Sequence, residues 1–261
     1  MILVVDMGNT HTVLGGYEGD SLVFELRMAT NRKATSDEWG LTVLQLLERQ
    51  KVDVSSIHGI AYASVVPQLE WAMQNAFERY LGQKALCVDH TCLPDMSINV
   101  DSPAEVGADR LVNAYAAWHR YQTAMILVDF GTATTFDVVS SEGAYLGGAI
   151  APGMELASDA LFFKAAKLPR VDVSNPKTAI GKNTPHAIRS GLFWGYVGLI
   201  DGLVTRLQEE CGETTKVVAT GGLAKLFAGA SETLTDVEPH LTLEGLRLIY
   251  EKNQERRRTS L

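Results

Sequence analysis

Several features that mark common protein classes are scarce in this chain of 261 residues. It has three cysteines, Cys87, Cys92 and Cys211, and no CxxC pair. An odd number of cysteines without paired spacing argues against a disulfide framework. Lys and Arg (23) are outnumbered by Asp and Glu (31), so the formal net charge is −8. Because a nucleic-acid-binding surface needs an excess of basic residues, we expect no nucleic-acid partner.

Long apolar runs are also missing. No stretch approaches the roughly 20 apolar residues of a membrane-spanning helix, and MILVVD at the start carries no basic segment of a secretory signal. We therefore expect a cytoplasmic protein with no membrane partner. The chain is nevertheless 46% hydrophobic, enough for a substantial core in one large domain or two of ordinary size.

One short segment groups side chains that bind metals elsewhere. CVDHTC, residues 87–92, holds two thiols, a carboxylate and an imidazole. A structural zinc site usually combines two such ligand pairs, and no second pair with that spacing occurs in the sequence. We interpret the segment as the end of a strand followed by a polar loop.

A second motif occurs twice. VVDMGNT (residues 4–10) and LVDFGTA (residues 127–133) each end an apolar run at Asp-x-Gly. A shift of 123 positions aligns Asp6 with Asp129, Gly8 with Gly131 and Thr12 with Thr135. Both copies continue with strand-forming residues that surround a turn signal, at residues 18–20 and 141–143. This pattern predicts strand, tight turn, strand in each half.

The hairpin weakens the Rossmann and Walker interpretations, in which the glycine loop leads straight into a helix that holds the phosphates. A glycine after the aspartate still lets the backbone approach a ligand closely. Amide and hydroxyl donors for phosphate follow at Asn9, Thr10, Thr132 and Thr134. Two carboxylates, Asp6 and Asp129, would repel a nucleotide unless a cation accompanied them, so the pair implies a metal.

The rest of each half alternates between helix and strand patterns. The expected strands cover residues 59–64, 85–88 and 216–220, and the expected helices cover 35–50 (with a capping box of Thr35 and Glu38), 67–81, 153–168, 184–210 and 243–253. A glycine pair, Gly221 and Gly222, follows the last strand and suits the adenosine side of a nucleotide site. We predict an α/β protein with the duplicated actin-like ATPase (ribonuclease H-like) fold, its halves at residues 1–120 and 121–261 around a nucleotide cleft.

Six stretches carry a more specific resemblance. They are DMGNT (6–10), EVGADRLVNA (105–114), DFGTATTFD (129–137), GGAIAPG (147–153), AAKLP (165–169) and ATGGLAK (219–225). Together they resemble type III pantothenate kinases. The resemblance implies ATP-dependent phosphorylation of pantothenate, the first committed step towards coenzyme A, by a homodimer. It also implies a requirement for Mg and for a monovalent cation, potassium or ammonium.

The resemblance assigns roles to individual residues. ATP binding falls on Asp6, Met7, Gly8, Asn9, Thr10, His11, Thr12, Val13 and Thr132. Asp129 matches the monovalent-cation ligand, and Asp6 is expected to hold Mg directly or through water. Pantothenate binding falls on Gly107, Ala108, Asp109 and Arg110, with Asp109 as the proton acceptor, and on Thr184 from the partner subunit. One position departs from the family, because several relatives carry a tyrosine where this chain has Val100.

Simpler roles compete with these assignments. Asn9 and Thr10 suit a turn, and Thr184 suits the N-cap before Pro185. Asp129 could be a buried structural carboxylate, and Arg110 a surface ion pair. Asp109 in the first turn of a helix would by itself be a partner of the helix dipole.

Wider alternatives also stay open. The apolar residues of the helix at 184–210, Leu192, Phe193, Tyr196, Val197, Leu199 and Ile200, predict a dimer surface, although a core helix would look the same. Two other functions also fit the scaffold: a nucleotide-binding regulator without turnover, and a polymerising or chaperone ATPase, for which the chain is short.

Overall fold

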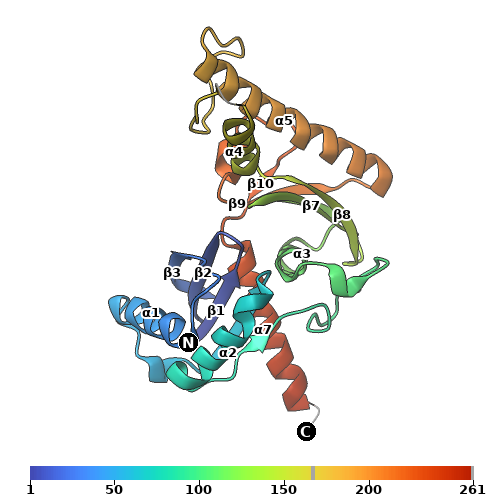
Figure 1. Cartoon of the computed structure of the whole chain (residues 1–261). Coiled ribbons are helices and arrows are strands. Elements are labelled where there is room, and N and C mark those ends of the chain that lie inside the picture. The colour runs from blue at the N-terminus through green and yellow to red at the C-terminus, as the bar shows by residue number, and fades with distance from the viewer. Residues whose placement is uncertain (166–167, 260–261) are drawn as a thin grey trace. The chain divides into compact units, whose positions relative to one another are not determined.

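The computed structural model describes residues 1–165 and 168–259, which form two compact units (Figure 1). Unit 1 comprises Met1–Met96, Asp101–His119 and Leu241–Leu261, and unit 2 comprises Ser97–Val100 and Arg120–His240. The observed units differ from the expected halves at residues 1–120 and 121–261 mainly in two places: Ser97–Val100 belongs to unit 2, and Leu241–Leu261 belongs to unit 1. The last helix packs with the first unit, against its strands β1 (Ile2–Met7) and β4 (Gly59–Ser64). No helix in the described part of the chain is both long and apolar enough to cross a membrane.

The sheet of unit 1 has five strands in the order β3-β2-β1-β4-β5. They are β1 (Ile2–Met7), β2 (His11–Glu18), β3 (Ser21–Ala29), β4 (Gly59–Ser64) and β5 (Leu86–Cys87). The β1 strand pairs antiparallel with β2 and parallel with β4. The two central strands, β1 and β4, are almost wholly buried, which explains their continuous apolar sequences.

Four α-helices belong wholly or mainly to unit 1: α1 (Ser36–Arg49), α2 (Pro67–Leu81), α3 (Ala108–Tyr121) and α7 (Leu241–Thr259), with 3-10 turns at Val54–Ser56 and Pro103–Glu105. The predicted capping box of α1 is confirmed, since Thr35 accepts from Glu38 N and Glu38 accepts from Thr35 N. Pro67 opens α2 as predicted, and the helix ends at Gly82 with φ 65°. The two helices pack together, and Trp39 meets Phe77 edge to face at 5.1 Å.

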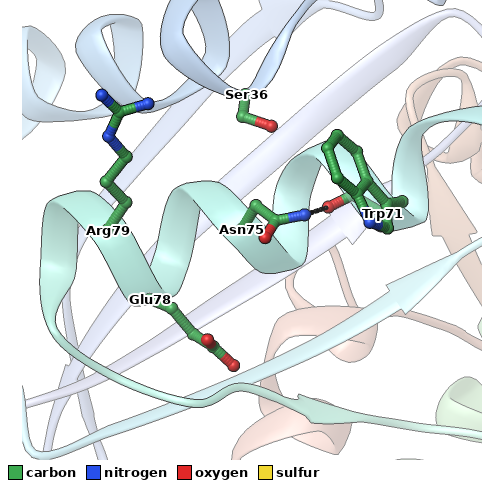
Figure 2. Close-up of a pocket in the computed structure, with 5 residues that line it drawn as sticks. All are labelled: Ser36, Trp71, Asn75, Glu78 and Arg79. Carbon is green, nitrogen blue, oxygen red and sulfur yellow. Dashed lines mark hydrogen bonds between the residues drawn. The ribbon is translucent and has the colours of Figure 1, made fainter.

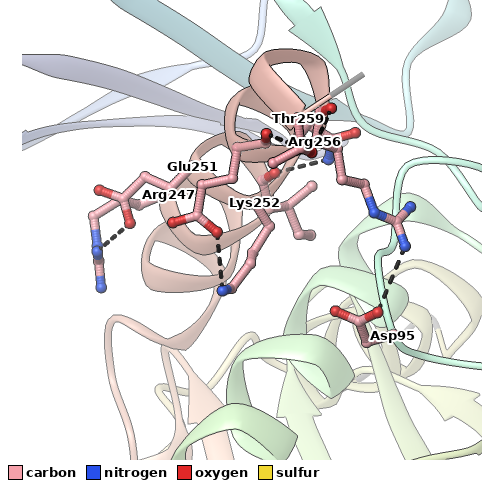
Figure 3. A network of polar contacts seen from close by, with 9 residues as sticks. Asp95, Arg247, Glu251, Lys252, Arg256 and Thr259 are labelled. Carbon is pink, nitrogen blue, oxygen red and sulfur yellow. Dashed lines mark hydrogen bonds and ion pairs between the residues drawn. The ribbon is translucent and has the colours of Figure 1, made fainter. Parts of the chain in front are cut away.

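A buried arginine fastens α7 to the first sheet. Arg247 is 5% exposed, and its Nη1 donates to Asp20 Oδ1 and to Glu251 Oε2, each at 2.7 Å. Asp20 lies in the β2–β3 turn, so this contact ties the hairpin to the last helix. Figure 3 shows the neighbouring contacts further along α7, where Arg256 approaches Asp95 at 3.5 Å. That outer pair is exposed, so we expect most of the stabilisation to come from Arg247.

The sheet of unit 2 repeats the first strand for strand, in the order β10-β9-β6-β7-β8. Its strands are β6 (Met125–Phe130), β7 (Ala133–Val139), β8 (Tyr145–Pro152), β9 (Lys216–Gly221) and β10 (Asp236–Val237). As in unit 1, the first strand pairs antiparallel with the second and parallel with the fourth. The prediction of a duplicated actin-like fold is confirmed.

The helices of unit 2 are α4 (Met154–Lys164), α5 (Thr184–Cys211) and α6 (Ala224–Ala228). The expected helix at 153–168 ends at Lys164, while residues 166 and 167 lie outside the described residues. The apolar residues of α5 pack inward: Leu192, Phe193, Tyr196, Val197 and Ile200 are buried in the core of this unit, and Leu199 packs against it. Their interpretation as a dimer surface was therefore wrong.

One carboxylate of α5 organises the loop that follows α6. Asp201 accepts hydrogen bonds from the hydroxyls of Ser231 (2.6 Å) and Thr233 (2.8 Å) and from the backbone N–H groups of Glu232 and Thr233. Burial opposes ionisation of Asp201, but these hydrogen bonds outweigh it and hold the pKa of the carboxyl below its usual range. The Asp201 carboxylate therefore fixes the conformation of the loop at residues 231–233 through these hydrogen bonds.

Candidate active site

The first Asp-x-Gly loop joins β1 to β2 through Gly8, Asn9 and Thr10. Its backbone is tied down from two sides. Gly8 N donates to His11 O at 3.0 Å, while Thr30 donates its hydroxyl to Gly8 O at 2.8 Å and its N–H to Thr10 O at 2.9 Å. Asn9, Thr10 and His11 remain exposed. The loop thus offers polar groups to a ligand from a fixed backbone.

The residues predicted for ATP in this segment do not all face outward. The side chains of Met7 and Thr12 are buried, at 0% and 1% exposure. Asp6 and Val13 are half-buried and face each other across the β1–β2 ladder. Met7 and Thr12 can therefore contact a ligand only through the main chain, whereas Asn9, Thr10 and His11 can also use their side chains.

The second loop, between β6 and β7, consists of Gly131 and Thr132. Gly131 N donates to Ala133 O at 3.0 Å, and Gly153 N donates to Thr132 O at 3.1 Å. A side chain at Gly153 would overlap the carbonyl oxygens of Gly131 and Thr132. The glycine in the GGAIAPG stretch thus allows the start of α4 to pack on this loop, and Thr132 stays exposed.

The two loops differ in length by one residue. Met7 pairs with Thr12 in the first hairpin, and Phe130 pairs with Thr134 in the second. Thr134, not Thr135, is therefore the counterpart of Thr12, so the alignment by a constant shift was wrong beyond the loop. Like Thr12, Thr134 is 1% exposed, which places it in the sheet interior and corrects its expected role as an outward phosphate donor.

Asp129 lies at the end of β6 and next to the late glycine pair. Gly221 has φ 88°, and a Cβ at that position would lie 2.5 Å from Asp129 Oδ1. A glycine is needed here both for the left-handed backbone and for the close approach of the carboxylate. The glycine pair, Gly221 and Gly222, was predicted for the adenosine side of the site. The structure shows in addition that the absence of a side chain at Gly221 makes room for the Asp129 carboxylate.

The GADR segment forms the start of α3, and Asp109 lies in its first turn as predicted. Asp109 Oδ1 accepts a hydrogen bond from Arg110 N at 2.8 Å. The carboxylate folds back over Gly107, where an added Cβ would lie 2.5 Å from the same oxygen. Asp109 and Arg110 are both half-buried. The carboxylate thus lies at the N-terminal end of α3, the position of a helix-dipole partner, and it is also a group that can act as a proton acceptor.

Thr184 is the first residue of α5, but it is not the N-cap. That role belongs to Asn183, whose Oδ1 accepts from His186 N at 2.9 Å. Thr184 is exposed, so the simpler capping role expected for it is wrong.

Val100 is half-buried beside Gly147, in a short segment that pairs with β8. Tyr145 N donates to Ser97 O at 2.9 Å, and Asn99 N donates to Tyr145 O at 2.8 Å. These two bonds anchor the segment that leads into GADR.

Among the described residues, no three His, Cys, Asp or Glu side chains converge as a metal site. In the CVDHTC segment, β5 ends at Cys87 and a turn follows, in which Asp89 Oδ1 accepts a hydrogen bond from Thr91 N at 2.7 Å.

Mg²⁺ in phosphoryl-transfer sites is commonly held by one or two carboxylates together with the substrate phosphates. Asp6, half-buried near the end of β1, is a carboxylate of the kind that fits such coordination.

A hollow of about 390 Å³ lies on unit 1, away from the predicted residues. Figure 2 shows its lining on α1 and α2, formed by Ser36, Trp71, Asn75, Glu78 and Arg79. Arg79 is engaged by Asp37 at 2.7 Å, and Asn75 donates to Trp71 O. None of the residues predicted for ATP or pantothenate lines this hollow.

Sequence reasoning missed several supporting residues of the two loops, notably Thr30, Arg32 and Gly153. Arg32 Nη2 donates to Asn9 Oδ1 at 2.9 Å. Only Gly153 lay in a stretch singled out from the sequence. Thr30 and Arg32 follow β3 and reach the loop through the strand pairing, a relation without a local sequence signal.

Comparisons with known proteins identify the family of the chain. The family model for type III pantothenate kinase matches residues 2–206. A type III pantothenate kinase of Anaeromyxobacter sp. (strain Fw109-5) is 51% identical, covering 97% of this chain and all of the relative. That of Geotalea daltonii is 49% identical over 98% of this chain and all of the relative.

Solved structures share the fold at much lower identity. A putative Baf family transcriptional activator from Campylobacter jejuni has a TM-score of 0.61 at 19% identity, covering 97% of this chain and 99% of its own. A putative 2-dehydro-3-deoxygalactonokinase from Sinorhizobium meliloti has a TM-score of 0.59 at 12% identity, with the same two coverages. The family model and the full-length relatives lead to one conclusion: the chain belongs to the type III pantothenate kinase family.

Proposed function

We propose that this protein transfers the γ-phosphoryl group of ATP to pantothenate, giving 4′-phosphopantothenate in the first step of coenzyme A biosynthesis. The observation that carries this assignment is the full-length match to type III pantothenate kinases at 51% identity. A kinase on an ATPase fold uses ATP with a divalent metal. Because ATP is the phosphoryl donor, we place the reaction in the cytoplasm. The presence of Asp109 favours a catalyst over a nucleotide-binding regulator on the same scaffold.

For the donor, we propose that residues 6–13 and Thr132 bind ATP. The exposed side chains of Asn9, Thr10 and Thr132 and the glycine-containing backbones support this role. We propose that Asp6 holds Mg²⁺ directly or through water, where the cation would neutralise phosphate charge. Phosphoryl transfer asks little covalent chemistry of a protein, so the loops act mainly by positioning.

For the acceptor, we propose that residues 107–110 bind pantothenate and that Asp109 orients its primary hydroxyl and takes its proton. The hydrogen bond from Arg110 N fixes one carboxylate oxygen, which limits the rotation of the group. A positioned general base typically contributes about 10²- to 10⁴-fold in rate. The Arg110 guanidinium suits the carboxylate end of pantothenate, because its planar fork matches a carboxylate.

We propose that Asp129 binds the monovalent cation, potassium or ammonium. The half-buried position of the Asp129 carboxylate, which the absence of a side chain at Gly221 allows, supports this role. Turnover of the wild type should be higher in potassium than in sodium-only buffer, and Asp129→Asn should weaken that response. Equal turnover in both buffers would remove the assignment.

We propose that the active unit is a homodimer in which Thr184 of the partner subunit reaches pantothenate. Support comes from large apolar side chains, each at least 40% exposed, on three elements of unit 2: Leu146 and Ile150 on β8, Leu156, Leu161, Phe162 and Phe163 on α4, and Trp194 on α5. Exposed apolar side chains in such number are typical of an interface. The exposed glycines of α5, Gly191, Gly195 and Gly198, would allow close approach of a partner.

Sedimentation tests the dimer. Phe163→Asp should shift the protein to a monomer and reduce activity. Trp71→Asp, at a 74% exposed position on unit 1, is the matched control and should stay dimeric. A fully active wild-type monomer at assay concentration would contradict the proposal.

The catalytic assignment is tested with a panel of small alcohols. Phosphate transfer from ATP should be efficient with pantothenate and much slower with sugars or other hydroxy acids, and mass spectrometry should identify 4′-phosphopantothenate. ATP binding without transfer to pantothenate would instead support the regulatory alternative.

A further inference from the structure

An acidic protein that binds a polyphosphate needs local positive charge. The formal net charge is −8, and the exposed donors of the first loop, Asn9 and Thr10, are neutral. Arg32, in the segment after β3, is a cation in contact with this loop. We propose that Arg32 is a further ATP-binding residue, which orients the Asn9 amide and contributes its charge to the phosphates. This inference rests on the proposed role of residues 6–13 in ATP binding.

The contact between Arg32 and Asn9 has a defined polarity. Arg32 Nη2 donates to Asn9 Oδ1 at 2.9 Å. A guanidinium has donors only, so the atom of Asn9 that faces it must be the carbonyl oxygen. The Nδ2 amino group, with its two N–H donors, is then directed away from Arg32. Arg32 thus sets Asn9 in the orientation that presents donors to an anion.

The backbone that carries Arg32 is fastened to the loop. On one side, Thr30 donates to Gly8 O and to Thr10 O, at 2.8 and 2.9 Å. On the other side, Asn31 Oδ1 accepts from Lys33 N at 3.1 Å, and Asn31 O accepts from Ala34 N at 3.0 Å. Arg32 therefore lies in a turn that is fixed relative to the first loop, so less ordering is needed when a ligand binds.

The charge of Arg32 is not neutralised by a nearby acid. Arg27 lies 3.6 Å from Glu25, and Arg79 lies 2.7 Å from Asp37. Arg32 has no carboxylate partner among the residues that the structure describes, and its recorded contact is with a neutral amide. A guanidinium has five N–H donors, so the bond to Asn9 leaves donors for phosphate oxygens, which arginine binds in a bidentate manner.

The kinetic test compares Arg32 with its neighbour. Loss of a charge-assisted hydrogen bond should raise the KM for ATP by about tenfold or more in Arg32→Ala, while the KM for pantothenate changes by less than about twofold. Arg32→Lys should recover part of the loss through its charge. Lys33→Ala, which removes an adjacent exposed cation, is the matched control and should behave like the wild type. A thermal melt of each variant checks that this exposed segment remains folded.

A binding measurement separates charge from orientation. Titration calorimetry with a non-hydrolysable ATP analogue, at low and high salt, should give a weaker salt dependence for Arg32→Gln than for the wild type. Gln keeps an amide donor on a shorter side chain and has no charge. Wild-type affinity and salt dependence in Arg32→Gln would overturn the charge contribution.

Asn9→Ala distinguishes failure of this inference from failure of the proposed ATP site. If Asn9→Ala weakens ATP binding and both Arg32→Ala and Arg32→Gln do not, the role of Arg32 is refuted while the loop assignment stands. If neither residue affects ATP binding, the role of Arg32 is likewise refuted, and the loop can act only through Thr10 and its main chain; a folded wild-type protein that does not bind ATP would remove the proposed ATP site itself.

Discussion

The sharpest prediction concerns Asp109→Asn. Asparagine keeps the size of the side chain, and its Oδ1 can still accept the hydrogen bond that Arg110 N donates at 2.8 Å. The variant therefore preserves the geometry over Gly107 and removes the proton acceptor. If Asp109 is the general base, kcat should fall by about 10²- to 10⁴-fold, equivalent to about 2.7–5.4 kcal/mol in the activation barrier.

The effect on stability should be small by comparison. Loss of a negative charge in the first turn of α3 costs about 0.3–1 kcal/mol through the helix dipole. For a protein of this size that corresponds to a fall in Tm of about 4 °C or less. Activity and stability should thus separate by at least a factor of two in free energy.

The assay follows ADP release at saturating ATP and pantothenate, together with a thermal melt and the KM for ATP. Since the loss is confined to the transition state, kcat and kcat/KM should fall together while the KM for ATP changes little. Glu105→Gln, at an exposed carboxylate on the preceding 3-10 turn, is the matched control. A folded Asp109→Asn protein that phosphorylates pantothenate within about tenfold of the wild type would return Asp109 to the role of dipole partner.

Three further predictions concern the framework of the site. Gly221→Ala should lower the free energy of unfolding by about 1–3 kcal/mol, because residue 221 has a φ of 88° and lies close to the Asp129 carboxylate. The same variant should weaken the response of turnover to potassium, and wild-type values of both stability and potassium response would refute the packing argument. Arg247→Ala should lower the free energy of unfolding in urea by about 1–3 kcal/mol, because a buried guanidinium loses its packing and its two hydrogen bonds. Arg256→Ala, at an exposed pair, should cost less than about 1 kcal/mol, and equal losses would contradict the role of burial. The pKa of Asp201 is lowered in the folded state. Its contribution to stability is therefore fully present above the unfolded pKa of about 3.9 and is lost as the pH falls through the folded pKa. Asp201→Asn should be less stable than the wild type at pH 7, and acid unfolding curves should show the difference in stability disappearing.

Much of the fold could be predicted because its signals are local. The buried strands β1 and β6 are continuous apolar runs that end at Asp-x-Gly, and the capping box of α1 and Pro67 of α2 mark helix starts within a few residues. The repeated hairpins then indicated the duplication. These signals need no knowledge of distant contacts, and the structure confirms them.

The errors have a different origin. An alignment of the two halves by a constant shift could not reveal that the second loop is one residue shorter. For that reason it paired Thr12 with Thr135 and missed that Thr134 is the buried counterpart of Thr12. The apolar residues of α5 suit a core and an interface equally, because hydrophobicity does not specify the partner. Adjacent Asn183 and Thr184 are both good N-caps, and only the backbone decides between them. The contact of Asn9 with Arg32 depends on the β2–β3 hairpin, across 23 positions.

The two Asp-x-Gly loops of the duplicated sheets differ in the charged groups beside them, which bears on their proposed roles toward phosphate. The first loop has neutral donors and a cation, Arg32, fastened beside it. The second loop has an exposed threonine, Thr132. Gly153 lets the start of α4 pack on the backbone of this loop, and Gly221 lets the backbone after β9 lie close to the Asp129 carboxylate. The positive charge of Arg32 and a monovalent cation held by Asp129, as proposed, would respond to different properties of the solution. The first is weakened by general ionic strength, while the second depends on the identity of the monovalent ion. If the proposed roles hold, the salt sensitivity of ATP binding should depend on Arg32 and the preference for potassium over sodium on Asp129, so variants at the two positions should act independently.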